Sequence, residues 1–435
     1  MSTTNFTEIN PLWIKFIKLV KAEVIPAIGC TEPISLAFAA ALAAKKLGKT
    51  VERIEAKVSA NLMKNGMGVT VPGTGTVGLA IAAAVGAIAG DPMAKLEVLN
   101  KLTPEHVVKG KQMIAEKRVQ LSTVNVNNIL YAEAKVFNGQ DWVKVCIADD
   151  HTNVVKIEQN GEIIFQAEGR LETAAADSSD FIKNICARDV FDFAEQVPLD
   201  MISFISEAGR INDQLSHAGM NGDYGLHIGA TFNRQILEGL MSDGIMTNII
   251  MRTTAASDAR MGGAPLPAVI NSGSGNQGIV ATMPVVVVAE YVKASEEDYT
   301  RALMLSHMMA IYIHSKLPKL SALCAVTTAA MGAAAGMAWL FKKDFNTITM
   351  VISNMIGDVS GMICDGAANS CAMKVSTAAG AAYKAVLMAL EGIRVTGNEG
   401  IVAECVDDSI ANLGMLATRG MLQTDNEILE IMLKK

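Results

Sequence analysis

The sequence has few aromatic residues, few histidines and no block of basic residues. Aromatic side chains make up 5% of the 435 residues, and the chain holds 6 histidines. The net charge is −7 and the sequence pI is about 5.5. A protein without a concentrated positive face is poorly suited to the phosphate backbone of nucleic acids. We therefore expect neither nucleic-acid binding nor a histidine cluster that holds a metal.

A signal peptide and a disulfide framework are also missing. The first ten residues do not show a basic stretch followed by an apolar run. Seven cysteines is an odd number in a long chain, which is typical of a reduced, cytoplasmic protein. Residues 320–341 carry no charge, but they are mostly Ala, Thr, Gly and Ser between two lysines. They predict a buried helix and no membrane association.

What the sequence does have is an abundance of small and flexible apolar residues. Half of it is hydrophobic, with 36 glycines and 25 methionines. This composition favours tightly packed helices with small residues at their contacts. At this length the chain can bury a large core, and we expect two lobes. A homo-oligomer is an open alternative to a monomer.

The pattern along the chain predicts an α+β fold. Residues 117–168 alternate between apolar and polar positions, with N-N, N-G and D-D turn signals between the segments. They predict an antiparallel sheet of four or five strands, and we expect further strands within 51–70. The predicted organisation is N-terminal helices at 1–48 packing on the helical lobe, a β-containing lobe at 49–177, and a helical catalytic lobe at 178–435.

Four of the seven cysteines form the strongest functional signal. Cys364 and Cys371 bracket the octet C-D-G-A-A-N-S-C, Cys324 stands forty residues before Cys364, and Cys30 lies in G-C-T-E-P. Each is expected near the start of a helix, where free N–H groups and the helix dipole lower a thiol pKa. The plain alternative is that cysteines are small core residues. That alternative suits the three other cysteines: Cys146, Cys186 and Cys405.

The spacing of these cysteines narrows the kind of metal site. Ligands of a structural zinc site usually stand two to four residues apart. Steps of seven and forty residues match neither that pattern nor the short ferredoxin runs. The option left is a cluster held by dispersed thiolates, with one iron open to substrate.

A polar loop supplies the second signal. The segment R-M-G-G-A-P-L-P-A-V-I-N-S-G-S-G-N-Q-G spans residues 260–278. Its glycines let the backbone approach a ligand, and a helix that follows can direct N–H groups at a carboxylate or phosphate. A plain connection between helices is the alternative. The candidate substrate-binding side chains are Asn271, Ser272, Ser274, Asn276 and Gln277.

Part of this loop and one histidine motif have further possible functions. S-G-N-Q-G is similar to a loop of pyridoxal-phosphate dehydratases, but no lysine stands between Lys183 and Lys293 to form the Schiff base. We therefore expect no pyridoxal phosphate. His227, in N-G-D-Y-G-L-H-I-G, is a candidate substrate-binding or acid–base group, with a satisfied loop histidine as the alternative.

Together these segments resemble the cysteine desulfidase family, which is related to the α part of bacterial iron–sulfur L-serine dehydratases. The resemblance covers nearly the whole chain. Its most specific elements are G-C-T-E-P at 29–33, N-S-G-S-G-N-Q-G at 271–278, and C-D-G-A-A-N-S-C at 364–371 with Cys324 upstream.

The resemblance implies conversion of L-cysteine and water to pyruvate, ammonia and hydrogen sulfide on a 4Fe–4S cluster. It implies that Cys324, Cys364 and Cys371 hold the cluster and leave one iron open to the substrate sulfur. Cys30 is then the catalytic base or a fourth ligand. An L-serine ammonia-lyase and a non-enzymatic iron–sulfur sensor or binding protein are the alternatives.

Overall fold

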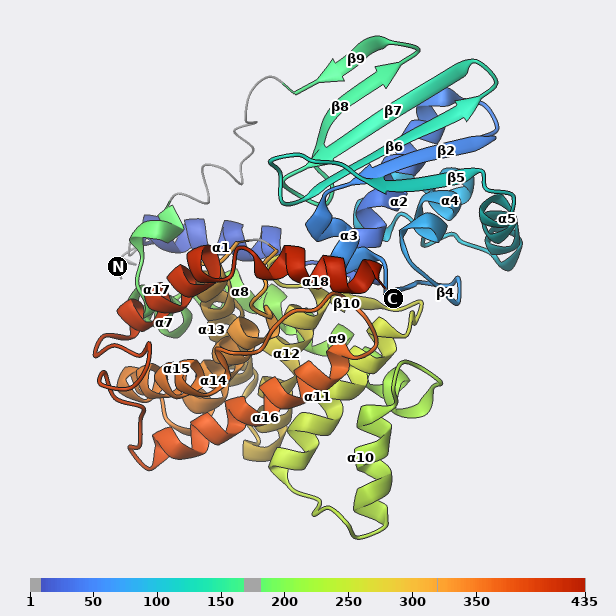
Figure 1. Cartoon of the computed structure of the whole chain (residues 1–435). Coiled ribbons are helices and arrows are strands. Elements are labelled where there is room, and N and C mark those ends of the chain that lie inside the picture. The colour runs from blue at the N-terminus through green and yellow to red at the C-terminus, as the bar shows by residue number, and fades with distance from the viewer. Residues whose placement is uncertain (1–8, 168–180, 319, 435) are drawn as a thin grey trace, which may run out of the picture.

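The computed structural model describes residues 9–167, 181–318 and 320–434. A lobe built around a β-sheet stands beside a larger helical lobe, and the C-terminal helix lies against the boundary between them (Figure 1). The predicted α+β class is confirmed. The predicted boundary at 177/178 lies outside the described residues.

The main sheet has six strands in the order β5-β2-β6-β7-β8-β9. Antiparallel pairing from β6 through β9 agrees with the alternation seen in 117–168. The sheet is nevertheless mixed, because β2 inserts between β5 and β6 and pairs with β5 in parallel. The strands are β2 (Arg53–Val58), β5 (Val119–Thr123), β6 (Tyr131–Asn138), β7 (Asp141–Ala148), β8 (Val154–Gln159) and β9 (Glu162–Gln166).

Segment 51–70 is only partly extended. After β2, Ser59 caps a helix by accepting a hydrogen bond from the Leu62 N–H at 3.4 Å. The expectation of strands within 51–70 is therefore confirmed for β2 and wrong for residues 60–66, which are helical. The elements that follow β2 are α3 (Ala60–Gly66), β3 (Thr70–Val71) and β4 (Thr76–Val77).

The two N-terminal helices belong to different lobes. α1 (Pro11–Glu23) places Phe16 and Val20 in the core of the helical lobe. α2 (Thr31–Leu47) is buried against β6 and β7, and its core neighbours belong to the sheet. The expectation that both helices pack on the helical lobe is therefore corrected for α2. The alanine-rich sequence of α2 allows burial on nearly every face, so its pattern did not indicate a partner.

Further helices complete the sheet lobe. α4 packs between α2 and α5, so all three lie on the same side of the sheet (Figure 1). The further helices of this lobe are α4 (Leu79–Ala89), the 3-10 helix η1 (Pro92–Glu97) and α5 (Pro104–Ala115).

The helical lobe is built around α14 (Val326–Phe341), which contacts α12, α13, α15 and α16. Residues 326–339 of this helix are buried, in agreement with the predicted buried helix. In the described parts of the chain, no helix has the length and apolar character needed to cross a membrane. The other elements are η2 (Ile182–Asn184), α7 (Ala187–Gln196), α8 (Leu199–Ile202), η3 (Ser203–Ile205), α9 (Ser206–Asn221), α10 (Ile228–Leu237), α11 (Ile245–Met261), α12 (Gly275–Val292), α13 (Glu296–His314), α15 (Phe345–Val359), α16 (Cys371–Leu390), α17 (Val406–Met415), the π-helical turn η4 (Leu416–Gly420) and α18 (Thr424–Leu433).

A short ribbon connects the lobes next to the candidate site. β1 (Pro26–Ile28) pairs antiparallel with β10 (Pro267–Val269), with Ala27 opposite Ala268. The chain enters the ribbon from α1 and leaves it into α2. The ribbon thereby holds the Cys30 turn beside the polar loop that follows β10.

Candidate functional site

A cavity of about 90 Å³ lies where the two lobes meet. Its walls include the thiols of Cys30, Cys324, Cys364 and Cys371. Pockets for drug-sized ligands are commonly 300 Å³ or more, so this cavity suits a much smaller molecule. Four cysteines that are far apart in the sequence therefore border one small space.

Two of these cysteines are held by backbone pairing. Leu323 and Ile363 form an isolated antiparallel bridge. The Cys324 N–H donates to the Met362 carbonyl at 2.9 Å, and the Cys364 N–H donates to the Ala322 carbonyl at 2.7 Å. This pairing places Cys324 and Cys364, which are forty residues apart in the sequence, on adjacent backbone segments.

The predicted helix starts are only partly observed. Cys371 is the first residue of α16, and Cys324 comes two residues before α14. Cys364 lies in the loop that precedes α16, where its bridge to the Cys324 segment replaces a helix start. The Gly-Ala-Ala-Asn-Ser spacer therefore forms the loop that the octet predicted.

Cys30 occupies the N-cap position of α2, and its side chain makes no capping hydrogen bond. The preceding Gly29 has φ +77°, and a side chain there would place its Cβ 2.2 Å from Cγ of Pro72. Glycine is therefore required on both steric and conformational grounds. The next residue, Thr31, donates its hydroxyl to the Gly273 carbonyl at 2.8 Å, which ties the Cys30 turn to the polar loop.

The protonation of the thiols differs from the expectation. Burial raises the pKa of Cys30, and the nearby Arg260 guanidinium opposes this effect only in part. Burial, together with the neighbouring Cys364, raises the pKa of Cys324 to about 12. Burial also raises the pKa of Cys371. The predicted lowering at helix starts was wrong here, because desolvation outweighs the helix dipole.

In the described parts of the chain, the cysteines border one cavity but form no ready-made site for a single metal ion. Within residues 9–167, 181–318 and 320–434, no three Cys, His, Asp or Glu side chains converge closely enough to hold one metal ion. Cysteines that hold an iron–sulfur cluster each bind through a thiolate around a shared core, so they need to border a common space. Cys324, Cys364 and Cys371 do so, and positive charge between buried thiols would favour their ionised form.

Four of the five predicted loop side chains line the same cavity: Ser272, Ser274, Asn276 and Gln277. Ser274 caps α12 through the Gln277 N–H at 3.5 Å. The amide oxygen of Asn276 accepts from the Ser257 hydroxyl at 3.1 Å.

Asn271 has a structural role instead. It is fully buried, and its amide nitrogen donates to the His307 carbonyl and lies 3.1 Å from His307 Nδ1. His307 Nε2 lies 3.0 Å from the Thr282 hydroxyl. The expected substrate contact of Asn271 is not what the structure shows, because its side chain anchors the loop to α13.

His227 lies outside the cavity. It comes just before α10, and its Nε2 lies 3.0 Å from Oδ1 of Asp223. The loop is held by Asp258, whose carboxylate accepts from the Gly229 and Leu226 N–H groups. The expected substrate-binding role of His227 is corrected to that of a loop histidine.

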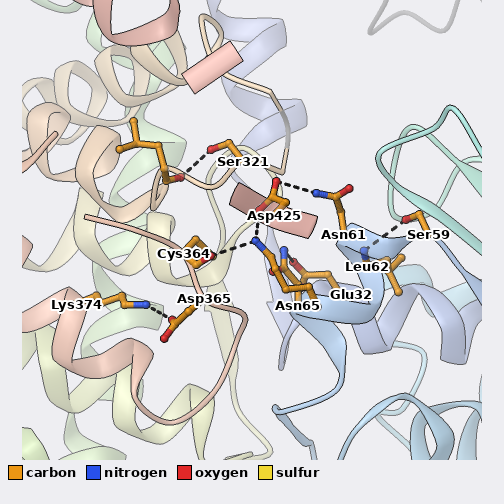
Figure 2. Close-up of polar contacts among 12 residues, drawn as sticks. Glu32, Ser59, Asn61, Leu62, Asn65, Ser321, Cys364, Asp365, Lys374 and Asp425 are labelled. Atoms are coloured by element: carbon orange, nitrogen blue, oxygen red, sulfur yellow. Dashed lines mark hydrogen bonds and ion pairs between the residues drawn. The ribbon is translucent and has the colours of Figure 1, made fainter. Parts of the chain in front are cut away.

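Sequence reasoning missed five polar residues that line the cavity: Glu32, Asn65, His151, Arg260 and Ser321. Glu32 lies next to Cys30 within G-C-T-E-P, and the Asn65 amide donates to its carboxylate at 3.4 Å (Figure 2). Arg260 opens the segment that ends in the polar loop. Its positive charge at the start of that motif is the sequence feature that indicates a role in the site.

A buried ion pair supports the loop between Cys364 and Cys371, which we call the cysteine loop. Lys64 is 1% exposed, and its ammonium donates to Asp425 Oδ1 at 2.5 Å and to the Cys364 carbonyl at 3.1 Å. Asn61 donates to the other carboxylate oxygen of Asp425 at 3.0 Å. Figure 2 shows α3, α18 and the cysteine loop meeting at this point.

Fold and site together define an α+β protein with a thiol-lined cavity between its lobes. Residues 93–430 match the model of the serine dehydratase alpha chain family. The chain belongs to this family.

Related proteins are similar over nearly their whole length. The chain is 65% identical to a UPF0597 protein of Chromobacterium violaceum over 428 residues, which cover 98% of both chains. It is 59% identical over 419 residues to a UPF0597 protein of Actinobacillus pleuropneumoniae serotype 3, covering 96% of both. It is 58% identical over 431 residues to the UPF0597 protein YhaM of Salmonella enteritidis, covering 99% of both.

Proposed function

We propose that this protein is an iron–sulfur-dependent lyase that converts L-cysteine and water to pyruvate, ammonia and hydrogen sulfide. The observation that carries the proposal is the cavity bordered by four thiols and by a neutral, glycine-rich loop. Family membership supports a lyase, since a serine dehydratase eliminates a β-substituent from an amino acid.

In this proposal Cys324, Cys364 and Cys371 hold a 4Fe–4S cluster. The three thiols come from two backbone-paired segments and the start of α16. When bound, the cluster would supply an open iron that acts as a Lewis acid toward the substrate sulfur. Soft sulfur suits such an iron better than a hydroxyl does, which favours cysteine as the substrate.

Cys30 is proposed to accept the α-proton of the substrate. The Arg260 guanidinium, 3.4 Å from its sulfur, favours the thiolate, whereas burial and Glu32 favour the thiol. The α-ammonium group of a bound amino acid would add a second positive charge beside Cys30 and shift this balance toward the thiolate.

Loss of the α-proton and of the β-sulfur leaves aminoacrylate, which hydrolyses to pyruvate and ammonia. The sulfur leaves as hydrogen sulfide, which carries the thiol proton of the substrate and the α-proton that Cys30 accepted, so Cys30 is regenerated. This overall reaction needs neither an external oxidant nor a reductant. The chain's task is to position the substrate, exclude bulk water and move one proton.

The direct test is a product assay on anaerobically reconstituted protein. We expect pyruvate and sulfide to form from L-cysteine in equal amounts, without added pyridoxal phosphate. Protein carried through mock reconstitution without iron is the control. Activity that required pyridoxal phosphate and survived iron chelation would overturn the proposal.

An L-serine ammonia-lyase is the second candidate, favoured by the family's description as a serine dehydratase alpha chain. The same assay with L-serine distinguishes it, because only cysteine yields sulfide. An iron–sulfur sensor without activity would turn over neither amino acid.

A further inference from the structure

A buried arginine faces the cavity without a carboxylate partner. Arg260, near the end of α11, is 4% exposed. Its Nη2 lies 3.4 Å from the Cys30 sulfur and its Nη1 lies 3.1 Å from the Met261 sulfur. Its Nε has no hydrogen-bond partner, and no ion pair to it occurs in the described parts of the chain. Glu32 lines the same cavity, but no ion pair joins it to Arg260 within the described residues. A buried guanidinium without a directly paired carboxylate is costly, so a bound anion is indicated.

The polar loop is shaped to accommodate this side chain. A Cβ on Gly275 would lie 2.0 Å from Arg260 Nε and 2.6 Å from its Cζ. Any other residue at 275 would collide with the guanidinium. Because Gly275 is the first residue of α12, the guanidinium and the opening turn of that helix lie together at the cavity wall.

We propose that Arg260 binds the α-carboxylate of the amino-acid substrate. The inference rests on the proposed function. The polar loop at 270–278 carries no charged side chain, so Arg260 supplies the positive charge that binds a carboxylate. A planar guanidinium binds a carboxylate through two parallel hydrogen bonds. Asn276, whose amide oxygen is held by the Ser257 hydroxyl, lines the same cavity and supplements this contact. Amines and amides without a carboxylate are therefore poor ligands.

Unreactive probes test this assignment apart from turnover. L-Alanine has no β-leaving group, and L-alaninamide differs from it by loss of the negative charge. Calorimetry on reconstituted wild-type protein should show L-alanine binding at least about tenfold more tightly than the amide. Arg260→Gln should abolish this preference, and Arg260→Lys should keep part of it. Arg234→Gln, the same change at an exposed arginine of α10, should bind like wild type.

Kinetics separate carboxylate binding from an effect on Cys30. Arg260→Gln should raise KM for L-cysteine at least about tenfold, with a smaller fall in kcat. An unchanged KM with a lower kcat and a pH–rate profile displaced to higher pH would mean that Arg260 acts only through the Cys30 thiolate. That result, or equal wild-type binding of L-alanine and its amide, overturns the proposal.

The two hypotheses fail in different ways. If wild-type protein prefers L-alanine but releases no pyruvate from L-cysteine, the proposed reaction is wrong and Arg260 keeps its role. If L-cysteine is turned over and Arg260→Gln leaves KM unchanged, only the arginine assignment fails. The wild-type comparison of the two probes needs no variant, so it decides even if Arg260→Gln does not fold.

Discussion

At the scale of single residues, the cysteines differ in whether they line the cavity. Cys364 borders the cavity, whereas Cys405 is exposed outside it. Cys364→Ala should remove the iron, because a cluster that loses one of three protein ligands is not retained. Wild-type protein prepared anaerobically should hold about four irons per chain. Cys405→Ala is the matched control and should keep them. Full iron in the Cys364→Ala protein would remove the central claim.

Cys30 is predicted to have a role separate from cluster binding. If it takes the α-proton, Cys30→Ala should retain its iron and lose turnover. If it is a fourth ligand, iron itself should fall. Iron content and pyruvate formation measured on one preparation separate these cases. An active variant with full iron would contradict both roles.

His307 makes folding sensitive to acid. Burial lowers the pKa of His307 to about 3, from an ordinary value of 6.5. The unfolded chain therefore binds a proton that the folded chain refuses, and stability falls as the pH drops below 6.5 toward 3. The free energy of unfolding should decrease by at most about 1.4 kcal/mol per pH unit from this group.

Two histidine variants check this dependence. In His307→Gln, urea unfolding measured between pH 7 and 4 should show a shallower acid limb than in wild type. His217→Gln, at an exposed histidine, serves as the control. Parallel acid limbs in all three proteins would contradict the assignment.

At the scale of elements, α18 is predicted to support the cysteine loop through α3. Asp425→Asn leaves the Lys64 ammonium buried without its counter-charge. Breaking a buried pair in this way should cost about 3 kcal/mol in urea unfolding. Glu427→Gln removes a charge from the same first turn at an exposed position, so it controls for the helix dipole. Equal losses in the two variants would mean that the pair adds nothing beyond the dipole.

For the whole molecule, the prediction concerns choice of substrate. L-Cysteine should exceed L-serine in kcat/KM by more than roughly tenfold, since thiolate is the better leaving group and the softer ligand. D-Cysteine should fail, because the carboxylate contact and Cys30 lie on fixed walls of one cavity. Pyruvate release from the three amino acids at matched enzyme concentration measures this. Preference for L-serine would place the protein with the hydroxyl-eliminating lyases.

Local patterns in the sequence were sufficient for much of the fold. Alternation predicted strands β6 to β9, and the charge-free run ending at Phe341 predicted the central helix α14. The octet predicted the loop between Cys364 and Cys371. These features depend on neighbours in sequence, where periodicity and turn residues act directly. The strand prediction was wrong in the middle of segment 51–70, because a helix of seven residues is too short for a 3.6-residue hydrophobic period to be recognised in the sequence.

The sequence alone determined the chemical nature of the site, since thiols, glycines and amides keep their character wherever the chain places them. Only the tertiary structure decided which of them act together. The ribbon between β1 and β10 brings Cys30 to the loop. Arg260, near the end of α11, lines the same cavity, whereas His227 does not. Burial raises the pKa of Cys30, whereas the sequence predicted that the helix start would lower it. Desolvation depends on everything packed around a group, which no local pattern contains.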